Sequence, residues 1–386
     1  MNIIHICLLS AYTENLSYDE NLLPEQNARD GHNVTVIADC HTIEDGVVVD
    51  TPEEDRTLAD GIRLIRIKYD RIINGFISGK IRKVSKLEEV VEKTKPDVIF
   101  FHGVQGCALL TAAKYKKNHP DVKLYADNHA DFSNSATNWL SKNVLHRIIW
   151  RYYAKKAEPY VDKFYGVLPA RCDFLHDVYG IPREKIELLV MGGDDEKIHP
   201  ENRDALRTEI CKRFGFAEGD FIAVSGGKLD RHKNIPILLD AFKRLDDPHI
   251  KLILFGSIAE DMKQPIETRL DNGKVKYIGW IDADKAYDYF IAADLAVFPG
   301  RHSVLWEQAV ACGIPGIFKH WEGTHHVDVG GNCEFLYRDS AEEIAAAILR
   351  IVGDPKFFGA MRESARRGAS GFLYRDIAKK AVGCAP

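Results

Sequence analysis

Short apolar runs alternate with amphipathic segments along almost the whole chain. An apolar run at 2–9 is followed by a helical pattern at 18–30, which ends at Gly31, and by a second apolar run at 33–38. An apolar strand, a helix closed by glycine and another apolar strand are typical of a βαβ unit with parallel strands. The sequence therefore predicts an α/β protein with parallel sheets.

The same alternation continues in both halves of the chain. In the first half we expect helices at 85–95 and 170–180, and strands at 62–69, 97–103, 123–130 and 163–169. In the second half we expect helices at 235–245, 284–293 and 304–313, and strands at 221–227, 251–256, 275–280, 295–300 and 314–318. The tail after residue 340 has a helical pattern throughout.

The polar, glycine-containing stretch at 191–204 interrupts this alternation. A chain of 386 residues is also longer than one compact core usually supports. We therefore predict two Rossmann-like, doubly wound domains facing a central cleft, at 1–197 and 198–370, with the helix at 371–386 packing back on the first domain. Ligands of such domains bind at the carboxyl ends of the strands.

The composition of the chain argues against several classes of function. The net charge of -5 argues against nucleic acid as a partner, because domains that bind it usually carry a basic face. The eight cysteines are scattered singly, without the Cys-x-x-Cys spacing of zinc or redox sites. No basic leader precedes the first apolar run, and no run reaches about 18 apolar residues. We expect a soluble protein of the reducing cytoplasm.

The turn after the predicted strand at 221–227 carries the strongest chemical signal. Gly226 and Gly227 allow the backbone to pass close to a ligand, and Lys228 and Lys233 lie five residues apart across the turn. Two ammonium groups that converge there suit a diphosphate. The alternative is a glycine-rich turn with two solvated lysines.

A second signal lies in residues 298–315. A strand ends at Pro299 and a helix is expected to begin near Ser303, where free N–H groups and the helix dipole attract phosphate. Glu307 lies in the first part of that helix among apolar residues, so its carboxylate needs partners, and two ribose hydroxyls would serve. The alternative is a first-turn glutamate that favours the helix dipole.

Together these motifs resemble the retaining GT-B glycosyltransferases, in particular family 4. The resemblance covers nearly the whole chain. It rests on Gly227-Lys228-Leu229 with Lys233, on Gly279-Trp280-Ile281, and on Glu307 with the segment Ala311-Cys312-Gly313-Ile314-Pro315.

The resemblance implies a role for each matched position. Gly226, Gly227, Lys228 and Lys233 hold the donor diphosphate, and the backbone at Trp280 and Ile281 meets the base. Glu307 binds the ribose, with His302, Ser303 and Val304 beside the donor. Lys228, Lys233, Glu307 and His129 are the expected catalytic residues.

The chain departs from the family pattern at one acidic position. Family members carry a second glutamate, eight residues before the one matched by Glu307, which touches the donor sugar. Here the loop is about four residues shorter, and Arg301, His302 and Ser303 occupy that space. The identity of the transferred sugar therefore stays open.

In the first half, the segment at 125–132 resembles the family segment whose histidine lies beside the donor sugar. That histidine is His129, and the neighbouring Asp127 can orient its imidazole. A turn-forming Asp-Asn-His at a strand end is the alternative. The strand at 97–103 resembles the family strand that ends in a histidine at the cleft, here His102.

Two segments, at 71–83 and 141–156, mix basic with aromatic and aliphatic residues. Such segments lie at anionic membrane surfaces, although amphipathic helices packed on a sheet look much the same. The resemblance favours peripheral association with the inner face of the cell membrane, because many relatives use lipid-linked acceptors.

The resemblance implies a retaining hexosyltransferase that moves a sugar from a nucleoside-diphosphate sugar, with UDP favoured, to a glycan or lipid-linked acceptor. Bacterial surface polysaccharide synthesis is the expected setting. No cofactor or divalent metal is expected, because the lysines and the helix start would stabilise the leaving diphosphate. The alternatives are a nucleotide-sugar epimerase and a non-catalytic subunit that binds sugar nucleotides.

Overall fold

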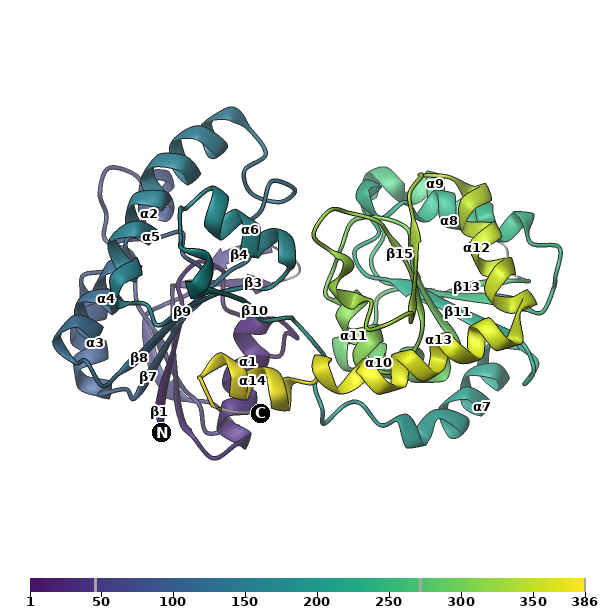
Figure 1. Ribbon diagram of the computed structural model, residues 1–386, viewed down its shortest axis with the longest axis horizontal. Coiled ribbons are helices and arrows are strands. Elements are labelled where there is room, and N and C mark those ends of the chain that lie inside the picture. The colour runs from purple at the N-terminus through teal and green to yellow at the C-terminus, as the bar shows by residue number, and fades with distance from the viewer. Residues whose placement is uncertain (45–46, 271–272, 385–386) are drawn as a thin grey trace. The chain divides into compact units, whose positions relative to one another are not determined.

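The computed structural model describes residues 1–44, 47–270 and 273–384, and the chain forms two compact units. The first unit comprises Met1–Val190 and Arg375–Pro386, and the second comprises Met191–Tyr374. Each is a largely parallel β-sheet with helices packed around it (Figure 1). The predicted α/β class is confirmed.

The sheet of the first unit has eight strands in the order β10-β9-β8-β7-β1-β2-β6-β5. All neighbouring strands are parallel except β5 and β6. The strands are β1 (Asn2–Cys7), β2 (Asn33–Ala38), β5 (Glu54–Thr57), β6 (Arg63–Arg66), β7 (Val98–Phe101), β8 (Lys123–Asn128), β9 (Lys163–Gly166) and β10 (Ile186–Leu188).

The helices of this unit are α1 (Asp19–Arg29), α2 (Gly75–Ile81), α3 (Lys86–Thr94), α4 (Ala108–Asn118), the π-helix η1 (Ser141–Trp150), α5 (Arg151–Ala157), the short η2 (Glu158–Tyr160) and η3 (Arg183–Lys185), α6 (Pro169–Asp177) and α14 (Tyr374–Ala381). Helix α14 is tied to the sheet by Tyr165, whose hydroxyl donates to the Lys380 carbonyl at 2.9 Å.

The second unit has a six-stranded parallel sheet in the order β13-β12-β11-β14-β15-β16. The strands are β11 (Phe221–Gly226), β12 (Ile250–Phe255), β13 (Val275–Tyr277), β14 (Leu295–Phe298), β15 (Gly316–Lys319) and β16 (Cys333–Leu336). The longer helices are α7 (Arg203–Phe214), α8 (Ile235–Arg244), α9 (Lys263–Glu267), α10 (Ala283–Ala292), α11 (Leu305–Ala311), α12 (Ala341–Gly353) and α13 (Pro355–Gly368). The short 3₁₀ helices are η4 (Pro200–Asn202), η5 (Arg231–Lys233), η6 (Glu260–Met262), η7 (His325–Val327) and η8 (Ala369–Phe372).

The strands that the sequence pattern did not predict lie mainly at edges. The antiparallel pair β3 (His41–Glu44) and β4 (Val47–Asp50) is separate from the main sheet, and its residues are exposed or half-buried. Strand β5 is an edge strand with mostly exposed polar residues. Edge strands do not need the continuous apolar run that identifies a buried parallel strand.

The boundary between the units lies at Met191, before the predicted position at 197. The intervening segment belongs to the second unit because Gly193 pairs with the end of the helical tail. Its N–H donates to Phe372 O at 2.9 Å, and its carbonyl accepts from the Tyr374 N–H at 3.1 Å. The second unit therefore extends to Tyr374, beyond the predicted end at 370.

Two glycines bring the strand ends of the second unit into close backbone contact. A Cβ on Gly256, which follows β12, would lie 1.8 Å from the carbonyl oxygen of Gly227. A Cβ on Gly300, which follows β14, would lie 2.4 Å from the carbonyl carbon of Lys233. No other residue fits at these contacts, because the neighbouring atoms are backbone. The turns after β11, β12 and β14 are therefore packed together.

We predict that Gly256→Ala destabilises the second unit by about 2 kcal/mol or more, since its φ of +114° and the contact with Gly227 both oppose a side chain. Gly359→Ala is the matched control, because Gly359 is exposed within α13 and a Cβ there meets nothing within 4 Å. The control should gain up to about 1 kcal/mol. Urea unfolding midpoints measure both effects, and equal midpoints would contradict the packing.

Candidate functional site

The candidate site of the second unit lies where β11 and β14 pair in the middle of its sheet. The chain leaves β11 toward β12 on one side and returns to β14 on the other side. Such a reversal point leaves space beyond the carboxyl ends of the two strands, where ligands of α/β sheets bind. The loops after both strands carry the residues singled out by the sequence.

The turn after β11 is tight and lies against helix α11. Gly227 has φ +109°, a conformation that favours glycine, and a Cβ added there would lie 3.1 Å from a methyl group of Leu305. Lys228 is exposed beside this turn, whereas Leu229 is fully buried and anchors it. The glycine turn and the start of α11 are therefore neighbours.

Lys233 joins the turn after β11 to the loop after β14. Its ammonium donates to the Arg301 carbonyl at 2.9 Å and reaches the His302 carbonyl at 3.5 Å. Burial lowers the pKa of Lys233 to about 8; Asp230 opposes this shift and Arg301 adds to it. The lysine is thus a partly buried cation held by backbone oxygens.

The loop after β14 stays non-helical further than the sequence predicted. Helix α11 begins at Leu305, two residues after the expected start at Ser303, and it has seven residues. The Lys233 ammonium bonds the carbonyls of Arg301 and His302, which holds this part of the loop in place. Val304 occupies the position before the helix, and its side chain makes no capping hydrogen bond.

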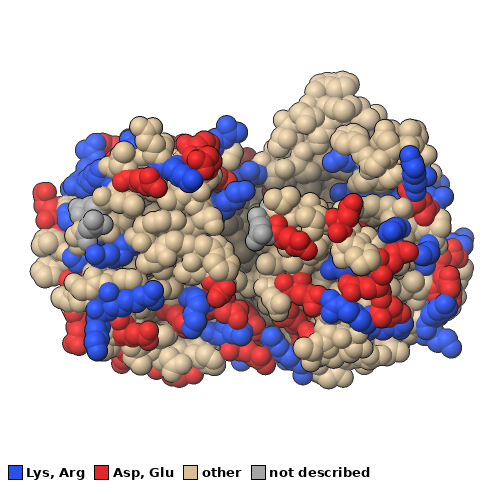
Figure 2. Space-filling model, turned by 180° about the vertical axis from the view of Figure 1, so that it is seen from behind, with Lys and Arg blue, Asp and Glu red and all other residues tan. Residues whose placement is uncertain are grey.

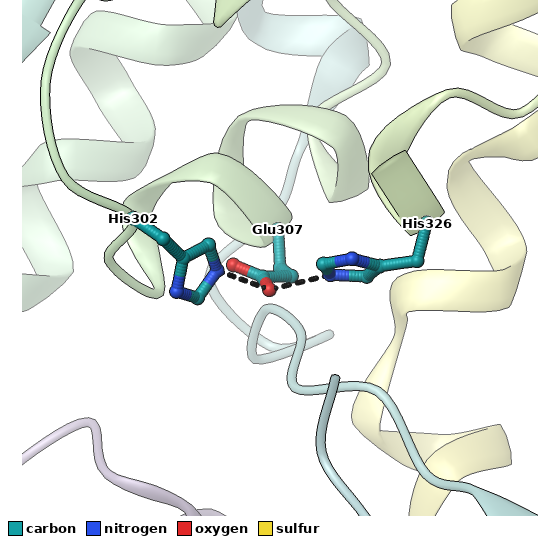
Figure 3. Close-up of side chains that lie close together, drawn as sticks. All are labelled: His302, Glu307 and His326. Carbon is teal, nitrogen blue, oxygen red and sulfur yellow. Dashed lines mark hydrogen bonds and ion pairs between the residues drawn. The ribbon is translucent and has the colours of Figure 1, made fainter. Parts of the chain in front are cut away.

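Glu307 lies between two histidines from different segments (Figure 3). One carboxylate oxygen, Oε1, accepts from His302 Nε2 at 2.7 Å and from His326 Nε2 at 2.8 Å. His302 comes from the loop before α11, and His326 comes from η7. The carboxylate is therefore fixed from both sides.

The second carboxylate oxygen of Glu307, Oε2, differs from Oε1 in its hydrogen bonding. Oε2 is buried and accepts no hydrogen bond from any described residue. Burial alone would raise the pKa of this carboxyl, but His302 and His326 outweigh burial and hold it below the usual range. A buried carboxylate oxygen without donors is costly, so Oε2 is suited to hydroxyl donors from a ligand.

His326 was missed by the sequence interpretation. It lies 19 residues after Glu307, and no local spacing links the two residues. The one signal in the sequence is indirect. A buried carboxylate needs hydrogen-bond donors, and the segment 320–326 contains three histidines that could supply them.

The turn with Trp280 and Ile281 is held next to the glycine turn. Gly256 N–H donates to the Gly279 carbonyl at 2.7 Å, and Gly256 itself contacts Gly227. Trp280 is 68% exposed and Ile281 is half-buried. The predicted donor residues of the second unit thus lie at the end of β11 and in the segments that follow β11, β13 and β14.

His129 lies in the first unit, just after β8. Its Nε2 is 3.3 Å from an oxygen of the buried Asp127 and 3.7 Å from one of Asp19. Burial alone would lower the pKa of His129, but Asp127 outweighs burial and raises it. The prediction that His129 acts together with the lysines and Glu307 stays a prediction.

Behind His129 a chain of buried side chains continues through the sheet. Asp127 also accepts from the Gly103 N–H at 2.6 Å and lies 3.1 Å from His102 Nδ1. His102 Nε2 lies 3.1 Å from Nδ1 of His5, whose other nitrogen is 2.9 Å from the Asn27 amide oxygen. His102, at 2% exposure, is thus a core residue of this chain and does not face solvent.

Among the described residues, two groups of side chains bring metal-ligand atoms within 4.8 Å of one another. They are Asp19, His102 and Asp127 in the first unit, and His302, Glu307 and His326 in the second. In the second group both imidazoles already donate to the carboxylate. A reaction without a metal stays a prediction.

Two family models match the chain, one on each side of the predicted boundary. The model of Glycosyltransferase Family 4 matches residues 22–197, and the model of Glycosyl transferases group 1 matches residues 207–368. The second match contains Lys228, Lys233 and Glu307, and the first contains His129.

Two curated relatives match over part of their length. Mannosylfructose-phosphate synthase of Agrobacterium fabrum is 25% identical over 236 residues, which are 57% of this chain and 51% of the relative. The lipopolysaccharide core biosynthesis glycosyltransferase LpsD of Rhizobium meliloti is 27% identical over 172 residues, 42% of this chain and 47% of the relative. The chain spans about half the length of the curated relatives it matches.

A solved structure matches the fold over both units. The Anabaena protein HepE, solved in complex with UDP, has a TM-score of 0.68 at 17% identity and covers 98% of each chain. This likeness supports the GT-B fold. With both family models matched, the chain belongs to the glycosyltransferases of group 1 and family 4 type.

Proposed function

We propose that the chain transfers a sugar from a UDP-sugar to a glycan or lipid-linked acceptor, with retention at the anomeric carbon. The nucleotide lies at the carboxyl ends of β11 and β14. Lys228 and Lys233 bind its diphosphate, and the backbone at Trp280 and Ile281 meets the base. His129 lies beside the donor sugar.

The arrangement of Glu307 carries this proposal. Its Oε1 is occupied by two imidazoles, while the buried Oε2 accepts from no described residue. A ribose offers two adjacent hydroxyl donors, which match such an oxygen better than the acceptor-rich diphosphate. Because His302 and His326 keep the carboxylate charged, its hydrogen bonds to hydroxyls are of the stronger, charge-assisted kind.

Lys233 couples the diphosphate to the ribose site. Glu307 is fully buried, and the loop at 299–304 places His302 against its carboxylate, so we infer that this loop moves before a ribose reaches Oε2. The Lys233 ammonium holds this loop through the Arg301 and His302 carbonyls. A diphosphate that attracts the ammonium releases both carbonyls, and the loop is then able to open.

The same lysine serves the chemical step. Cleavage of the bond to the anomeric carbon leaves negative charge on the diphosphate, and cations placed beforehand stabilise that charge as it develops. Lys233 is partly desolvated, which strengthens its interaction with an anion. Lys228, which is exposed, adds a second charge at the glycine turn.

Two relatives support the choice of donor and acceptor. HepE was solved with UDP, and LpsD is named for lipopolysaccharide core biosynthesis. These names favour uridine as the base and a surface glycan as the acceptor.

We predict that Lys233→Ala lowers turnover about 100- to 1,000-fold, because it removes one preorganised charge from the leaving group. Release of UDP from UDP-glucose is the measurement, with acceptor-independent hydrolysis as the basal reaction. Lys243→Ala, on the exposed side of α8, is the matched control and should leave turnover unchanged. Near-normal turnover in a folded Lys233→Ala protein would falsify this role.

We also predict that UDP affinity falls as pH rises through about 8. The diphosphate favours the charged ammonium, so its pKa is higher in the complex than the value near 8 in the protein alone. Below that value the lysine is charged in both states; above it, binding must first protonate the lysine. Affinity at about pH 9 should be about tenfold weaker than at about pH 7.

Titration calorimetry at both pH values measures this loss together with proton uptake. Lys233→Arg stays charged throughout and should bind UDP with little pH dependence. Equal pH dependence in the wild type and in Lys233→Arg would assign the titration to another group.

Glu307→Gln tests the ribose contact separately. The wild type should bind UDP about 10- to 100-fold more tightly than 2′,3′-dideoxy-UDP, because charged hydrogen bonds contribute about 1.5–3 kcal/mol. In Glu307→Gln this preference should shrink to less than about threefold. Because both nucleotides bind the same variant, the ratio of their affinities is unaffected by a general loss of stability. An unchanged preference for UDP in Glu307→Gln would place the ribose away from Glu307.

A further inference from the structure

Two segments of the first unit, 71–83 and 132–156, contain no acidic residue. They include four and five Lys or Arg residues respectively, in a chain whose net charge is -5. The segments cover helix α2, helix η1, most of α5 and the loop before η1. We call the outer side of these elements the basic–aromatic surface.

Large apolar side chains of this surface point to solvent. Their exposed fractions range from 55% to 73%, far above the values of core residues. In Figure 2 this part of the unit protrudes at the top of the view as a lobe with few charged atoms. The residues are Ile73, Phe76, Trp139, Leu140, Ile148 and Tyr152.

The two segments form one continuous surface. The indole N–H of Trp150 donates to the Lys80 carbonyl at 3.0 Å, which joins the end of η1 to α2. Arg82 lies over the Trp150 ring at 5.8 Å. Exposed groups on α2 therefore belong to the same face as those on η1 and α5.

Three lysines of this surface lie over its aromatic rings. Lys80 is 5.6 Å from the Phe76 ring centre, and Lys142 is 4.8 Å from that of Phe132. Lys156 lies 5.8 Å from the ring of Tyr152. Each pair combines an apolar body with a cationic end.

Acidic side chains enter this surface only at its margins. Lys83 lies 3.8 Å from Asp70, and Lys155 lies 3.5 Å from Glu158. Among the described residues, no ion pair involves Arg147 or any of the three lysines that lie over aromatic rings. The central part of the surface therefore keeps a positive charge beside exposed apolar groups.

We propose that the basic–aromatic surface docks on a bilayer that contains anionic phospholipid. Exposed aromatic and aliphatic side chains enter the headgroup region, and Lys and Arg contact the lipid phosphates. The contact is interfacial: among the described residues, no helix combines the length and the hydropathy needed to cross a membrane.

The basic–aromatic surface follows directly in sequence after His129, the candidate site residue of the first unit. The loop from His129 leads directly into it, and the Asn134 amide donates to the His129 carbonyl at 2.7 Å. Docking therefore positions the His129 loop near lipid headgroups. This consequence rests on the proposed function, whereas docking itself does not.

Vesicle sedimentation tests the docking directly and requires no enzyme activity. The full chain should sediment with vesicles of equal parts phosphatidylcholine and phosphatidylglycerol, and at least about tenfold less with phosphatidylcholine alone. High salt should weaken the binding, because it screens the lysines and arginines.

Two double variants separate the apolar and the charged contributions. Phe76→Ser with Trp139→Ser, and Lys142→Glu with Arg147→Glu, should each lower binding to the anionic vesicles at least about tenfold. The matched controls are Val47→Ser and Lys117→Glu, which change exposed residues of the same unit outside this surface. The controls should bind like the wild type.

Circular dichroism and UDP binding establish that each variant is folded. Equal sedimentation of folded variants and wild type would overturn the proposal, as would equal binding to neutral and anionic vesicles. Light scattering supplies a further test. A dimer in the wild type that becomes a monomer in Phe76→Ser with Trp139→Ser would assign the surface to a second copy of the chain.

Discussion

The candidate site of the second unit depends on the ammonium of Lys233. A cation at this depth has a cost, which is visible in the lowered pKa, and backbone carbonyls offset only part of it. The same ammonium joins the loops after β11 and β14 by its hydrogen bonds to the Arg301 and His302 carbonyls. The loop after β14 carries His302, which in turn fixes Glu307. The proposed diphosphate and ribose positions are therefore mechanically linked through one side chain.

Buried elements were predictable from the sequence, and long-range contacts were not. Apolar runs identified β1, β7, β11 and β14 because a central parallel strand must be apolar on both faces. The pair β3–β4 lacked that pattern because its residues are exposed or half-buried. The boundary at Met191 follows from the pairing of Gly193 with Leu373, which no local composition reveals.

In the candidate site, too, local patterns were predictable from the sequence and long-range contacts were not. The lysine turn and Glu307 could be predicted as site residues because glycines, lysines and a carboxylate in apolar surroundings are local signals. His326 was not found, because its role exists only through a contact across 19 residues. His102 was expected at a strand end at the cleft, and its buried contacts with His5 and Asp127 were not foreseen. The basic segments at 71–83 and 141–156 were visible in the sequence despite a net charge of -5, but the contact of Trp150 with Lys80 that joins them was not.

A crystal structure of the protein with UDP tests the central claim most directly. We expect a ribose hydroxyl within about 3 Å of Glu307 Oε2, with His326 still bonded to Oε1. We also expect that the Lys233 ammonium has moved from the Arg301 carbonyl to a phosphate oxygen. UDP bound away from Glu307, or Lys233 still held by both loop carbonyls, would contradict the account.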